Sequence, residues 1–360
     1  MKEFVSGTKI VSGMGAMAAL QGLNAKKLLV VTDPYFAKNG MAQKVAAAAG
    51  AQQVQVFDKV APDPSVALVA EGTAAVREFC PDVMVALGGG SAMDCAKAML
   101  FFAGGDIRLV AIPTTSGSGS EVTDFAILTH EKVKHPLIHS RLRPEMAILD
   151  DSLVTGLPPS LVADGGFDVL SHALEAFVAE NASPFTDAFA KDAFCCAFGA
   201  LPASFEGQMD ARGKVHIAAT MAGMAFTQAG LGICHALSHS LGGMFHIPHG
   251  RLNAILLPSV VGCNAAAAGE KYARLARAAG LGGSVDTIAV RNLKNGLIRL
   301  RRELHLPETL AQAGVDPNQV QQAAGDIVAA ALKDPCCQTN PVKADALLLR
   351  KILEEVTGRG

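Results

Sequence analysis

The sequence predicts an α/β protein with two domains: a Rossmann-like, doubly wound parallel-sheet domain in residues 1–156 and an all-helical domain in residues 157–360. Three observations predict this plan. Near-continuous apolar runs alternate with helical stretches up to Asp150, as in a parallel sheet covered by helices on both faces. Glycine-rich loops follow two of these runs, at the sheet edge where such folds bind ligands. Beyond Leu157 the strand patterns stop, and apolar residues recur at helical spacing.

Five short apolar runs are the predicted strands of the N-terminal domain. A helix that reaches residues 46–49 is predicted after the first run. A second helix, from about Ser65 to Phe79, is predicted after the proline-rich turn at residues 62–64. The five runs begin at Lys27, Val54, Val83, Leu109 and Ala147.

The boundary between the two domains is marked by the sequence LPPS at residues 157–160. Proline ends a preceding element and is accepted in the first turn of a helix, so this sequence indicates both a stop and a start. Further helices are predicted from Asp316-Pro317 and over residues 344–356. Leucines at helical spacing predict one more, and these are Leu293, Leu297, Leu300 and Leu304.

Composition limits the classes of function that this chain can have. Half of the 360 residues (50%) are hydrophobic, enough for two cores. The 31 basic and 33 acidic residues include no basic block, so we expect no nucleic-acid partner. We also expect no membrane partner, because no uncharged apolar run reaches membrane-spanning length and the N-terminus does not resemble a signal peptide. The cysteines form no CxxC pair, which indicates reduced thiols in a soluble, cytoplasmic protein.

Histidines are concentrated between Gly230 and Gly250, in a stretch without any acidic or basic residue besides them. Imidazole binds metals and titrates near neutrality, so this stretch indicates a metal site or proton transfer. Upstream, Asp168 and His172 are four residues apart and share one face of a predicted helix. Any single histidine here is better explained as a core residue, but the whole set favours a metal site. The stretch contains His235, His239, His246 and His249.

Two glycine-rich loops, at residues 88–94 and 113–121, follow predicted strands. Glycine lets the backbone approach a phosphate, and the helix N-terminus after the first loop offers free N–H groups. Ser91 and Asp94 also fit a capping box, which is a structural alternative for that loop. Two such loops on one parallel sheet favour a dinucleotide over a single anion.

Asp33 follows the first predicted strand, where a carboxylate can accept hydrogen bonds from an adenosine ribose. The same charge would repel a 2′-phosphate, so Asp33 favours NAD over NADP. A helix N-cap ahead of Pro34 explains this aspartate equally well.

These motifs resemble those of the iron-dependent (group III) alcohol dehydrogenases over essentially the whole chain. The matching stretches are GGGSAMDCAKAM, IPTTSGSGSEVT, MAILD, FDVLSHALEAFV, AGMAFTQAGLGICHALSHSLGG, PHGRLNAILLP and the C-terminal TNP. Within that family, ALEAFV, FTQAGLG and FHIPHG are most similar to the propanol dehydrogenases of propanediol-utilisation microcompartments.

The resemblance implies a site for Fe²⁺, which would also accept Zn²⁺. His239 would be a pocket residue beside the metal, with a role in proton relay or in the structure of the pocket. By spacing alone His246 could form a ligand pair with His249, but this pair ranks behind His235 with His249. The implied metal ligands are Asp168, His172, His235 and His249.

The resemblance also implies sites for NAD(H) and for the alcohol, with Phe125 and Phe226 lining the alcohol site. The turn PDP at residues 62–64 departs from the PNP of many relatives, which leaves one contact to the adenosine half open. The implied cofactor-binding residues are Asp33, Gly89, Gly90, Ser91, Asp94, Thr114, Thr115, Ser118, Thr123 and Lys134.

The expected activity is reversible, metal-assisted hydride transfer between NAD(H) and a short-chain alcohol or aldehyde, such as 1-propanol and propanal. Alternatives are a glycerol or 1,3-propanediol dehydrogenase, a lyase similar to the dehydroquinate synthases, and a non-catalytic scaffold. A lyase with an anionic substrate would need basic residues near the metal, and residues 166–180 and 220–250 contain neither lysine nor arginine. Expected partners are further copies of the chain, as a dimer or larger, and a microcompartment shell or its enzymes.

Overall fold

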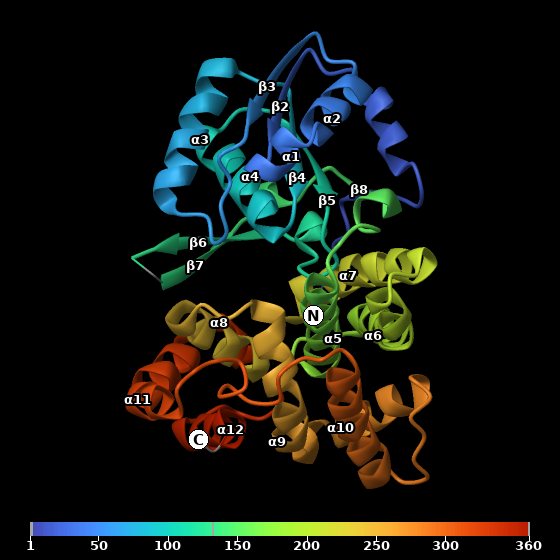
Figure 1. The fold of residues 1–360 in the computed structure, drawn as a ribbon, viewed down its shortest axis with the longest axis vertical. Helices are drawn as coiled ribbons and strands as arrows, with labels where there is room; N and C mark the ends of the chain where they lie inside the picture. The colour runs from blue at the N-terminus through green and yellow to red at the C-terminus, as the bar shows by residue number, and fades with distance from the viewer. Residues whose placement is uncertain (1–2, 132, 359–360) are drawn as a thin grey trace. The chain divides into compact units, whose positions relative to one another are not determined.

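The computed structural model describes residues 3–131 and 133–358, which form two compact units (Figure 1). One unit is Val5–Leu157, and the other runs from Pro158 onward and includes the N-terminal residues up to Phe4. The ring of Phe4 stacks on Phe185 and on Phe189 of the helical unit, with a centroid distance of 5.7 Å to each.

The N-terminal unit is built on a six-stranded parallel sheet with the strand order β1-β8-β5-β4-β2-β3. The predicted parallel sheet and all five predicted strands are confirmed. The sixth strand, β1, was not predicted, because it is short, its residues are mostly exposed and it therefore lacks an apolar run. The strands are β1 (Lys9–Ser12), β2 (Lys27–Val31), β3 (Gln53–Phe57), β4 (Val83–Gly88), β5 (Arg108–Pro113) and β8 (Met146–Leu149).

Helices cover both faces of this sheet, because successive side chains of each strand point to opposite sides. Leu29, Met84 and Leu109 pack with α3 (Val66–Phe79) and α4 (Gly90–Ala103) on one face. Leu28 and Val85 belong to the core on the other face. That face is covered by α2 (Met41–Ala49) and the 3₁₀ helix η1 (Ala16–Leu23), and α1 (Pro34–Lys38) follows β2.

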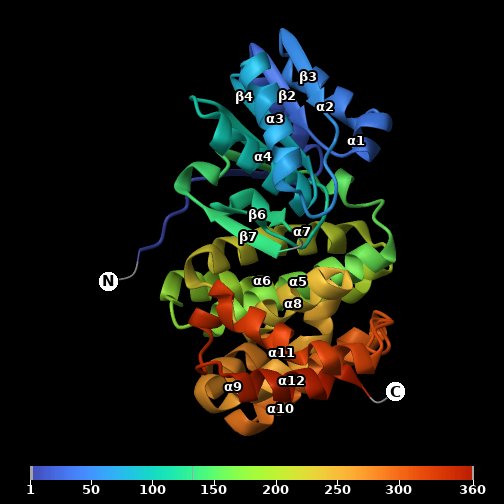
Figure 2. The ribbon, with the colours of Figure 1, turned by 90° about the vertical axis from the view of Figure 1, so that its left-hand side faces the viewer.

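An antiparallel hairpin of β6 (Phe125–His130) and β7 (Val133–Ile138) was not predicted. It packs against α4 (Figure 2). The amide of Thr129 donates to the carbonyl of Pro64 at 2.9 Å, so the hairpin is also joined to the turn ahead of α3. The 3₁₀ helices of this unit's second half are η2 (Ser120–Val122), η3 (Ser140–Leu142) and η4 (Asp151–Leu153).

The second unit is helical and shows no strand among its described residues, as predicted. Prolines stand at the first position of α5, α6 and α11, and the side chains of Ser183, Asp316 and Asp345 cap α6, α11 and α12. The helices are α5 (Pro159–Val178), α6 (Pro184–Phe205), α7 (Met209–Ala229), α8 (Ile233–Phe245), α9 (His249–Ala278), α10 (Asp286–Glu303), α11 (Pro317–Lys333), η5 (Pro335–Thr339) and α12 (Ala346–Thr357).

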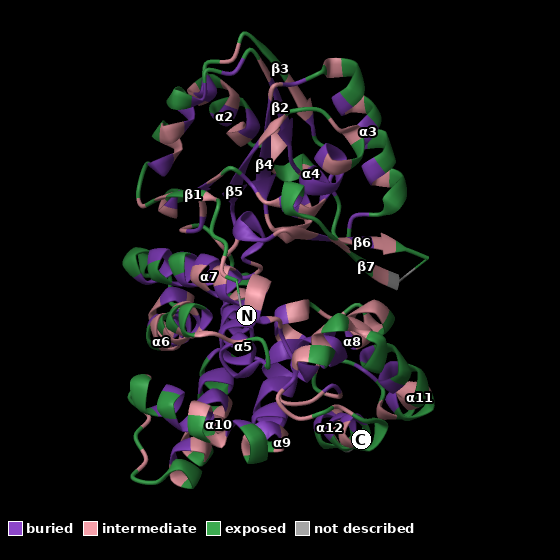
Figure 3. Ribbon diagram, turned by 180° about the vertical axis from the view of Figure 1, so that it is seen from behind, coloured by how far each residue is buried: buried purple, intermediate pink, exposed green. Residues whose placement is uncertain are grey.

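Helices α5 and α9 form the centre of this unit and are buried along most of their length (Figure 3). By length and mean hydropathy alone, α9 would be able to cross a membrane. However, 67% of its most apolar window is buried inside the protein, as in the core helix of a soluble protein.

Candidate functional site

Four side chains from three helices converge in the helical unit. Asp168 and His172 lie one turn apart on α5, His235 lies on α8, and His249 is the first residue of α9. Their ligand atoms all lie within 4.8 Å of one another. From Oδ1 of Asp168, the nearest imidazole nitrogens are at 3.5 Å (His249), 3.7 Å (His172) and 3.9 Å (His235). The structure thus brings together the four residues that the resemblance implies as metal ligands.

The position of His249 depends on a close approach between α9 and α5 at Gly250. A Cβ on Gly250 would lie 1.9 Å from the carbonyl oxygen of Asp164, so only glycine fits there. Arg251 donates to both carboxylate oxygens of Asp164, at 3.2 and 3.0 Å. The start of α9 is therefore fixed against α5 one turn before Asp168.

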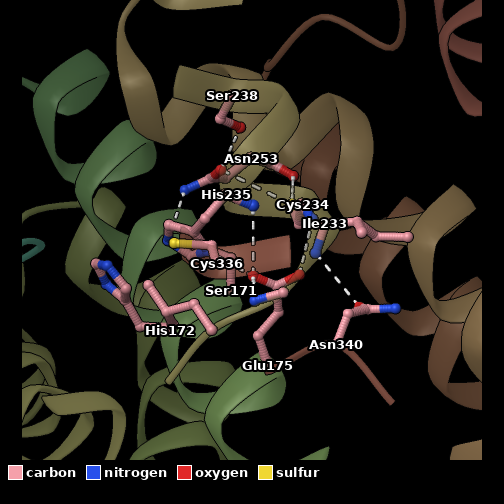
Figure 4. A network of polar contacts seen from close by, with 12 residues as sticks. Ser171, His172, Glu175, Ile233, Cys234, His235, Ser238, Asn253, Cys336 and Asn340 are labelled. Atoms are coloured by element: carbon pink, nitrogen blue, oxygen red, sulfur yellow. Dashed lines mark hydrogen bonds and ion pairs between the residues drawn. The ribbon is translucent and has the colours of Figure 1, made fainter. Parts of the chain in front are cut away.

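Glu175 positions His235 and was not found from the sequence (Figure 4). Its Oε2 lies 2.6 Å from Nδ1 of His235, and its two oxygens accept the amides of Gly232 and Cys234 at 2.9 and 2.8 Å. The carboxylate thus caps α8, which has no side-chain cap of its own. Because Nδ1 is engaged, His235 presents Nε2 to the cluster, as metal-bound histidines commonly do. Spacing could have revealed Glu175, which lies seven residues after Asp168 on α5.

Asn253 lies one turn after His249 on α9 and points its amide nitrogen into the cluster. Nδ2 is 3.0 Å from Oδ1 of Asp168, 3.2 Å from Nε2 of His249 and 3.4 Å from Nε2 of His235. One amide group therefore lies within hydrogen-bonding distance of the carboxylate and of two imidazole nitrogens. This convergence of three imidazoles and one carboxylate suits a divalent iron or zinc ion.

Burial shifts the protonation equilibria in the cluster. Burial raises the pKa of Asp168 above its ordinary value, although His172 and Asn253 oppose the rise. Burial, with the charges of His172 and His239, lowers the pKa of His235 well below its ordinary value. Burial also raises the pKa of Glu175 to about 7, against the hydrogen bonds from backbone amides. A neutral imidazole is the form that binds a metal, so the shift of His235 favours ligation.

Phe226, on α7, is buried and stacks on the ring of His172 at a centroid distance of 4.3 Å. His172 in turn stacks on His235 at 4.5 Å. An apolar wall therefore adjoins the cluster. Phe125 begins β6 and belongs to the N-terminal unit.

His239 lies one turn beyond His235 on α8, and its ring stacks on that of His249 at 5.1 Å. Its Nδ1 is 2.8 Å from Oδ2 of Asp334, a partner that the sequence analysis missed. Burial alone would raise the pKa of Asp334, but the hydrogen bond and charge of His239, together with hydrogen bonds from Cys336, lower this pKa to about 2. His246 is the left-handed C-cap of α8 and stands outside the four-residue cluster.

In the N-terminal unit the two glycine-rich loops face each other. A Cβ on Gly89 would lie 3.1 Å from Oγ1 of Thr115, and one on Gly90 would lie 3.3 Å from Oγ of Ser118. Gly89 is the N-cap of α4 and makes no side-chain cap, so the capping box proposed for Ser91 is wrong: Ser91 already lies inside the helix. The first N–H groups of α4 therefore lack a side-chain cap and adjoin hydroxyl groups, as in an anion site.

The two carboxylate oxygens of Asp33 have different surroundings. Oδ1 accepts the amides of Tyr35 and Phe36 at 2.8 and 3.1 Å, so Asp33 is the N-cap of α1. The other oxygen, Oδ2, lies 3.8 Å from where a Cβ on Gly88 would stand. One oxygen thus caps a helix while the other faces the first glycine-rich loop.

The remaining residues implied for the cofactor are held in different ways. Asp94 accepts the Ser120 hydroxyl at 2.9 Å, and the amide of Thr114 donates to the Gly88 carbonyl at 3.0 Å. Lys134 forms an ion pair with Asp63 at 2.7 Å, in the PDP turn at residues 62–64. Thr123 accepts a hydrogen bond from Lys97, which the sequence analysis did not single out.

Comparison with known proteins covers nearly the whole chain. A family model described as iron-containing alcohol dehydrogenase matches residues 7–151, and the C-terminal model of the Fe-containing alcohol dehydrogenase family matches residues 162–357. The chain is 42% identical to the 1-propanol dehydrogenase PduQ of Citrobacter freundii, with coverage of 99% of this chain and 100% of the relative. It is 36% identical to the NADPH-dependent butanol dehydrogenase of Clostridium saccharobutylicum, with coverage of 98% and 97%.

Solved structures agree with this relationship. A 1,3-propanediol oxidoreductase superposes with a TM-score of 0.93 at 32% identity, over 99% of this chain and 100% of the other. The sulfoacetaldehyde reductase of Bifidobacterium kashiwanohense, in complex with NAD⁺, superposes with a TM-score of 0.90 at 26% identity over 100% of both chains. The matches to both family models, and the full-length identity to curated relatives, show that this chain belongs to the iron-containing alcohol dehydrogenase family.

Proposed function

We propose that the protein is an iron-loaded, NAD(H)-dependent alcohol dehydrogenase that interconverts short-chain aldehydes such as propanal and primary alcohols such as 1-propanol. The observation that carries this proposal is the convergence of Asp168 with three histidine side chains beside the apolar ring of Phe226. The similarity to a 1-propanol dehydrogenase over the full length supports the choice of substrate.

The proposed metal ligands are Asp168, His172, His235 and His249. Bound iron would act as a Lewis acid toward the oxygen of the substrate and so ease loss of the hydroxyl proton. Glu175 and Asn253 touch these ligands and would hold their orientation. The same donor set would accept zinc, and the family favours iron.

The proposed cofactor site is formed by the N-terminal unit, with the pyrophosphate at the start of α4 between the two glycine-rich loops. The nicotinamide would exchange a hydride with the carbon that carries the substrate oxygen. Binding of NAD⁺ by one structural neighbour supports this choice, while the NADPH-dependent relative makes cofactor preference a question for experiment. The proposed residues are Asp33, Gly89, Gly90, Ser91, Asp94, Thr114, Thr115, Ser118, Thr123 and Lys134.

His239 is the proposed acid–base residue. Asp334 accepts the hydrogen bond of its Nδ1, which leaves Nε2 as the nitrogen that can take up a proton. The hydrogen bond to this carboxylate also fixes the orientation of the imidazole ring. The histidine would take the proton in the direction of alcohol oxidation and return it during aldehyde reduction.

The test is a substrate series, with metal-loaded enzyme prepared without air and NADH consumption followed by absorbance. A buried apolar wall gains about 0.8 kcal/mol per methylene that leaves water, so kcat/KM should rise from ethanal through propanal toward butanal and then fall with longer chains. Succinic semialdehyde should be a poor substrate, because its carboxylate would lose its hydration without gaining a partner. Phe226→Ala should move the optimum to longer aldehydes. Rapid turnover of a charged aldehyde, with propanal near background, would overturn this choice of substrate.

The second candidate is a 1,3-propanediol dehydrogenase, favoured by the close superposition on a 1,3-propanediol oxidoreductase. It predicts faster turnover of 1,3-propanediol than of 1-propanol in the oxidation assay.

We further propose that residues 1–156 and 157–360 act as the cofactor-binding and metal-binding domains of a cytoplasmic homo-oligomer. Enclosure in a microcompartment is proposed from the similarity to the propanol dehydrogenases and predicts co-purification with shell protein.

A further inference from the structure

Lys97 is a fully buried lysine in the middle of α4, and 0% of its surface is exposed. No other lysine among the described residues is buried in this way. Four oxygen atoms surround its Nζ: Ser120 Oγ at 3.1 Å, the Thr123 carbonyl at 3.0 Å, Thr123 Oγ1 at 2.8 Å and the Phe125 carbonyl at 3.0 Å. All four belong to residues 120–125, which run from the end of the second glycine-rich loop into the first residue of β6.

Asp94, one turn earlier on α4, also forms hydrogen bonds with this part of the chain. Its Oδ1 accepts the Ser120 hydroxyl at 2.9 Å, and its Oδ2 accepts the amide of Ile127 at 3.2 Å. Burial lowers the pKa of Lys97 to about 8, while the carboxylates of Asp94 and Glu121 oppose the fall. A buried charge is a costly way to fill space, because a well-packed apolar side chain often stabilises as much. The hydrogen bonds of Lys97 and Asp94 are therefore better explained by a need to hold the segment that follows the second glycine-rich loop in one defined position.

The second glycine-rich loop is held in position by hydrogen bonds at both of its ends. At its start, the amide of Thr114 donates to the carbonyl of Gly88 at 3.0 Å. At its far end, Lys97 holds residues 120–125. Between these points Thr115 and Ser118 face the glycines at the start of α4, at the distances given above.

We propose that Lys97 is a positioning residue of the cofactor site, whose ammonium group holds the loop of residues 114–119 against the N-terminus of α4 before the dinucleotide binds. This inference rests on the proposed cofactor site. A loop that is already in place loses little conformational freedom on binding, so the network lowers the Kd of the dinucleotide. Without the ammonium group, residues 120–125 lose the donor that they share. The loop would then become ordered only when the dinucleotide binds, and this cost would raise the Kd of the dinucleotide.

The experiment measures the Kd of NADH by fluorescence titration of the full-length, metal-loaded protein. Lys97→Met keeps the length of the side chain and removes its charge, and should raise the Kd about tenfold or more, equivalent to ~1.4 kcal/mol. The KM for NADH should rise with the Kd, whereas kcat at saturating NADH should fall much less. Metal content should stay unchanged, because the proposed ligands belong to the helical unit.

Met99→Ala is the matched control, because Met99 is equally buried on α4 but lies against Gly72 of α3. It should lower the Tm and leave the Kd within about twofold of wild type, a change below ~0.5 kcal/mol. An unchanged Kd in folded Lys97→Met, or an equal rise in Met99→Ala, would show that Lys97 only supports packing. If Lys97→Met does not fold, Ser120→Ala replaces it, and an unchanged Kd there also overturns the proposal. If wild type binds no NADH, the proposed function itself fails.

Discussion

At the scale of single residues, two of the proposed ligands and the proposed acid–base residue each contact a neighbour that is not a ligand. Glu175 orients His235, Asn253 donates to Asp168, and Asp334 holds His239. Such partners fix the ring orientation and the nitrogen that a histidine presents. Function at this site therefore depends on pairs of residues. Variants of the ligands and variants of nearby residues that are not ligands should differ sharply in metal content.

The first prediction concerns the metal ligands. Asp168→Ala, His172→Ala, His235→Ala and His249→Ala should each lose bound metal and nearly all activity, because each removes one of four donors. His246→Ala is the control and should retain metal, since His246 lies at the end of α8 outside the cluster. His239→Ala should retain metal but lose activity. Metal analysis of the purified variants checks this, and metal loss in His246→Ala with retention in His235→Ala would reverse the assignment.

The second prediction concerns the cofactor preference set by Asp33. Wild type should prefer NADH, and Asp33→Asn should raise the NADPH/NADH ratio of kcat/KM through a relief of about 1–3 kcal/mol of charge repulsion. Asparagine caps a helix about as well as aspartate, so this variant keeps the cap of α1 and removes only the charge. Asp33→Gly should shift the ratio in the same direction at a stability cost of only a few tenths of a kcal/mol. A ratio that stays at the wild-type value in both variants would leave Asp33 with helix capping alone.

At the scale of elements, the N-terminus of α8 is the part on which the site depends most. Glu175 accepts hydrogen bonds from the amides of Gly232 and Cys234 at this end of the helix. The amide of Ile233 donates to Oδ1 of Asn340, in the C-terminal TNP sequence, at 3.3 Å. The hydroxyl of Thr339 donates to the carbonyl of Leu231 at 2.7 Å. The chain segment after α11 thus supports the helix that carries His235, from a distance of 107 residues between Ile233 and Asn340.

The third prediction tests this arrangement at Gly232. A Cβ there would lie 2.6 Å from Oε1 of Glu175 and 2.7 Å from Oδ1 of Asn340. Gly232→Ala should displace both oxygens, loosen His235 and weaken metal affinity by about 10–100-fold. Gly199→Ala is the control, because an added Cβ on that exposed site of α6 meets nothing within 4 Å. It should keep the metal and gain about 0.4–1 kcal/mol of stability. Equal metal affinity of Gly232→Ala and wild type would argue against a role for this contact.

At the scale of the whole molecule, the two units carry different proposed ligands, the dinucleotide in one and the metal in the other. Each ligand stabilises the folded state that binds it, by RT ln(1 + [L]/Kd). The effect of a ligand should therefore be found first in its own unit.

The fourth prediction follows from this division. Removal of iron by a chelator should lower the hydrogen-exchange protection of α5, α8 and α9, because these helices supply the four clustered side chains. NADH at about 100 times its Kd should stabilise the cofactor unit by about 2.7 kcal/mol and protect β4, β5 and the start of α4. Exchange measured by mass spectrometry separates the two responses. Chelation that exposes β4 and β5 while sparing α8 would contradict the placement of the metal.

Five of the six strands of the parallel sheet and several helices could be predicted from the sequence alone, because these elements follow from local periodicity. Continuous apolar runs mark the buried strands, and prolines and capping residues mark helix starts such as Pro159 and Pro317. The glycine-rich loops and the histidine stretch were equally visible. Together with the resemblance to a family, they were enough to name the four residues that cluster in the helical unit.

Only the tertiary structure decided how these residues are supported. Asp334 is 95 residues from His239, and Glu175 is 60 residues from His235, so no local pattern links either pair. The hairpin of β6 and β7 owes its place to contacts with α4 and with the turn at Pro64, and β1 joins the sheet edge without a buried residue. The capping box at Ser91 failed because the N-cap of α4 is Gly89, two residues earlier. Lys97 looks like a surface lysine in the sequence, and only its burial among four oxygen atoms gives it a role. Contacts between distant segments depend on packing geometry, which periodicity along the chain does not encode.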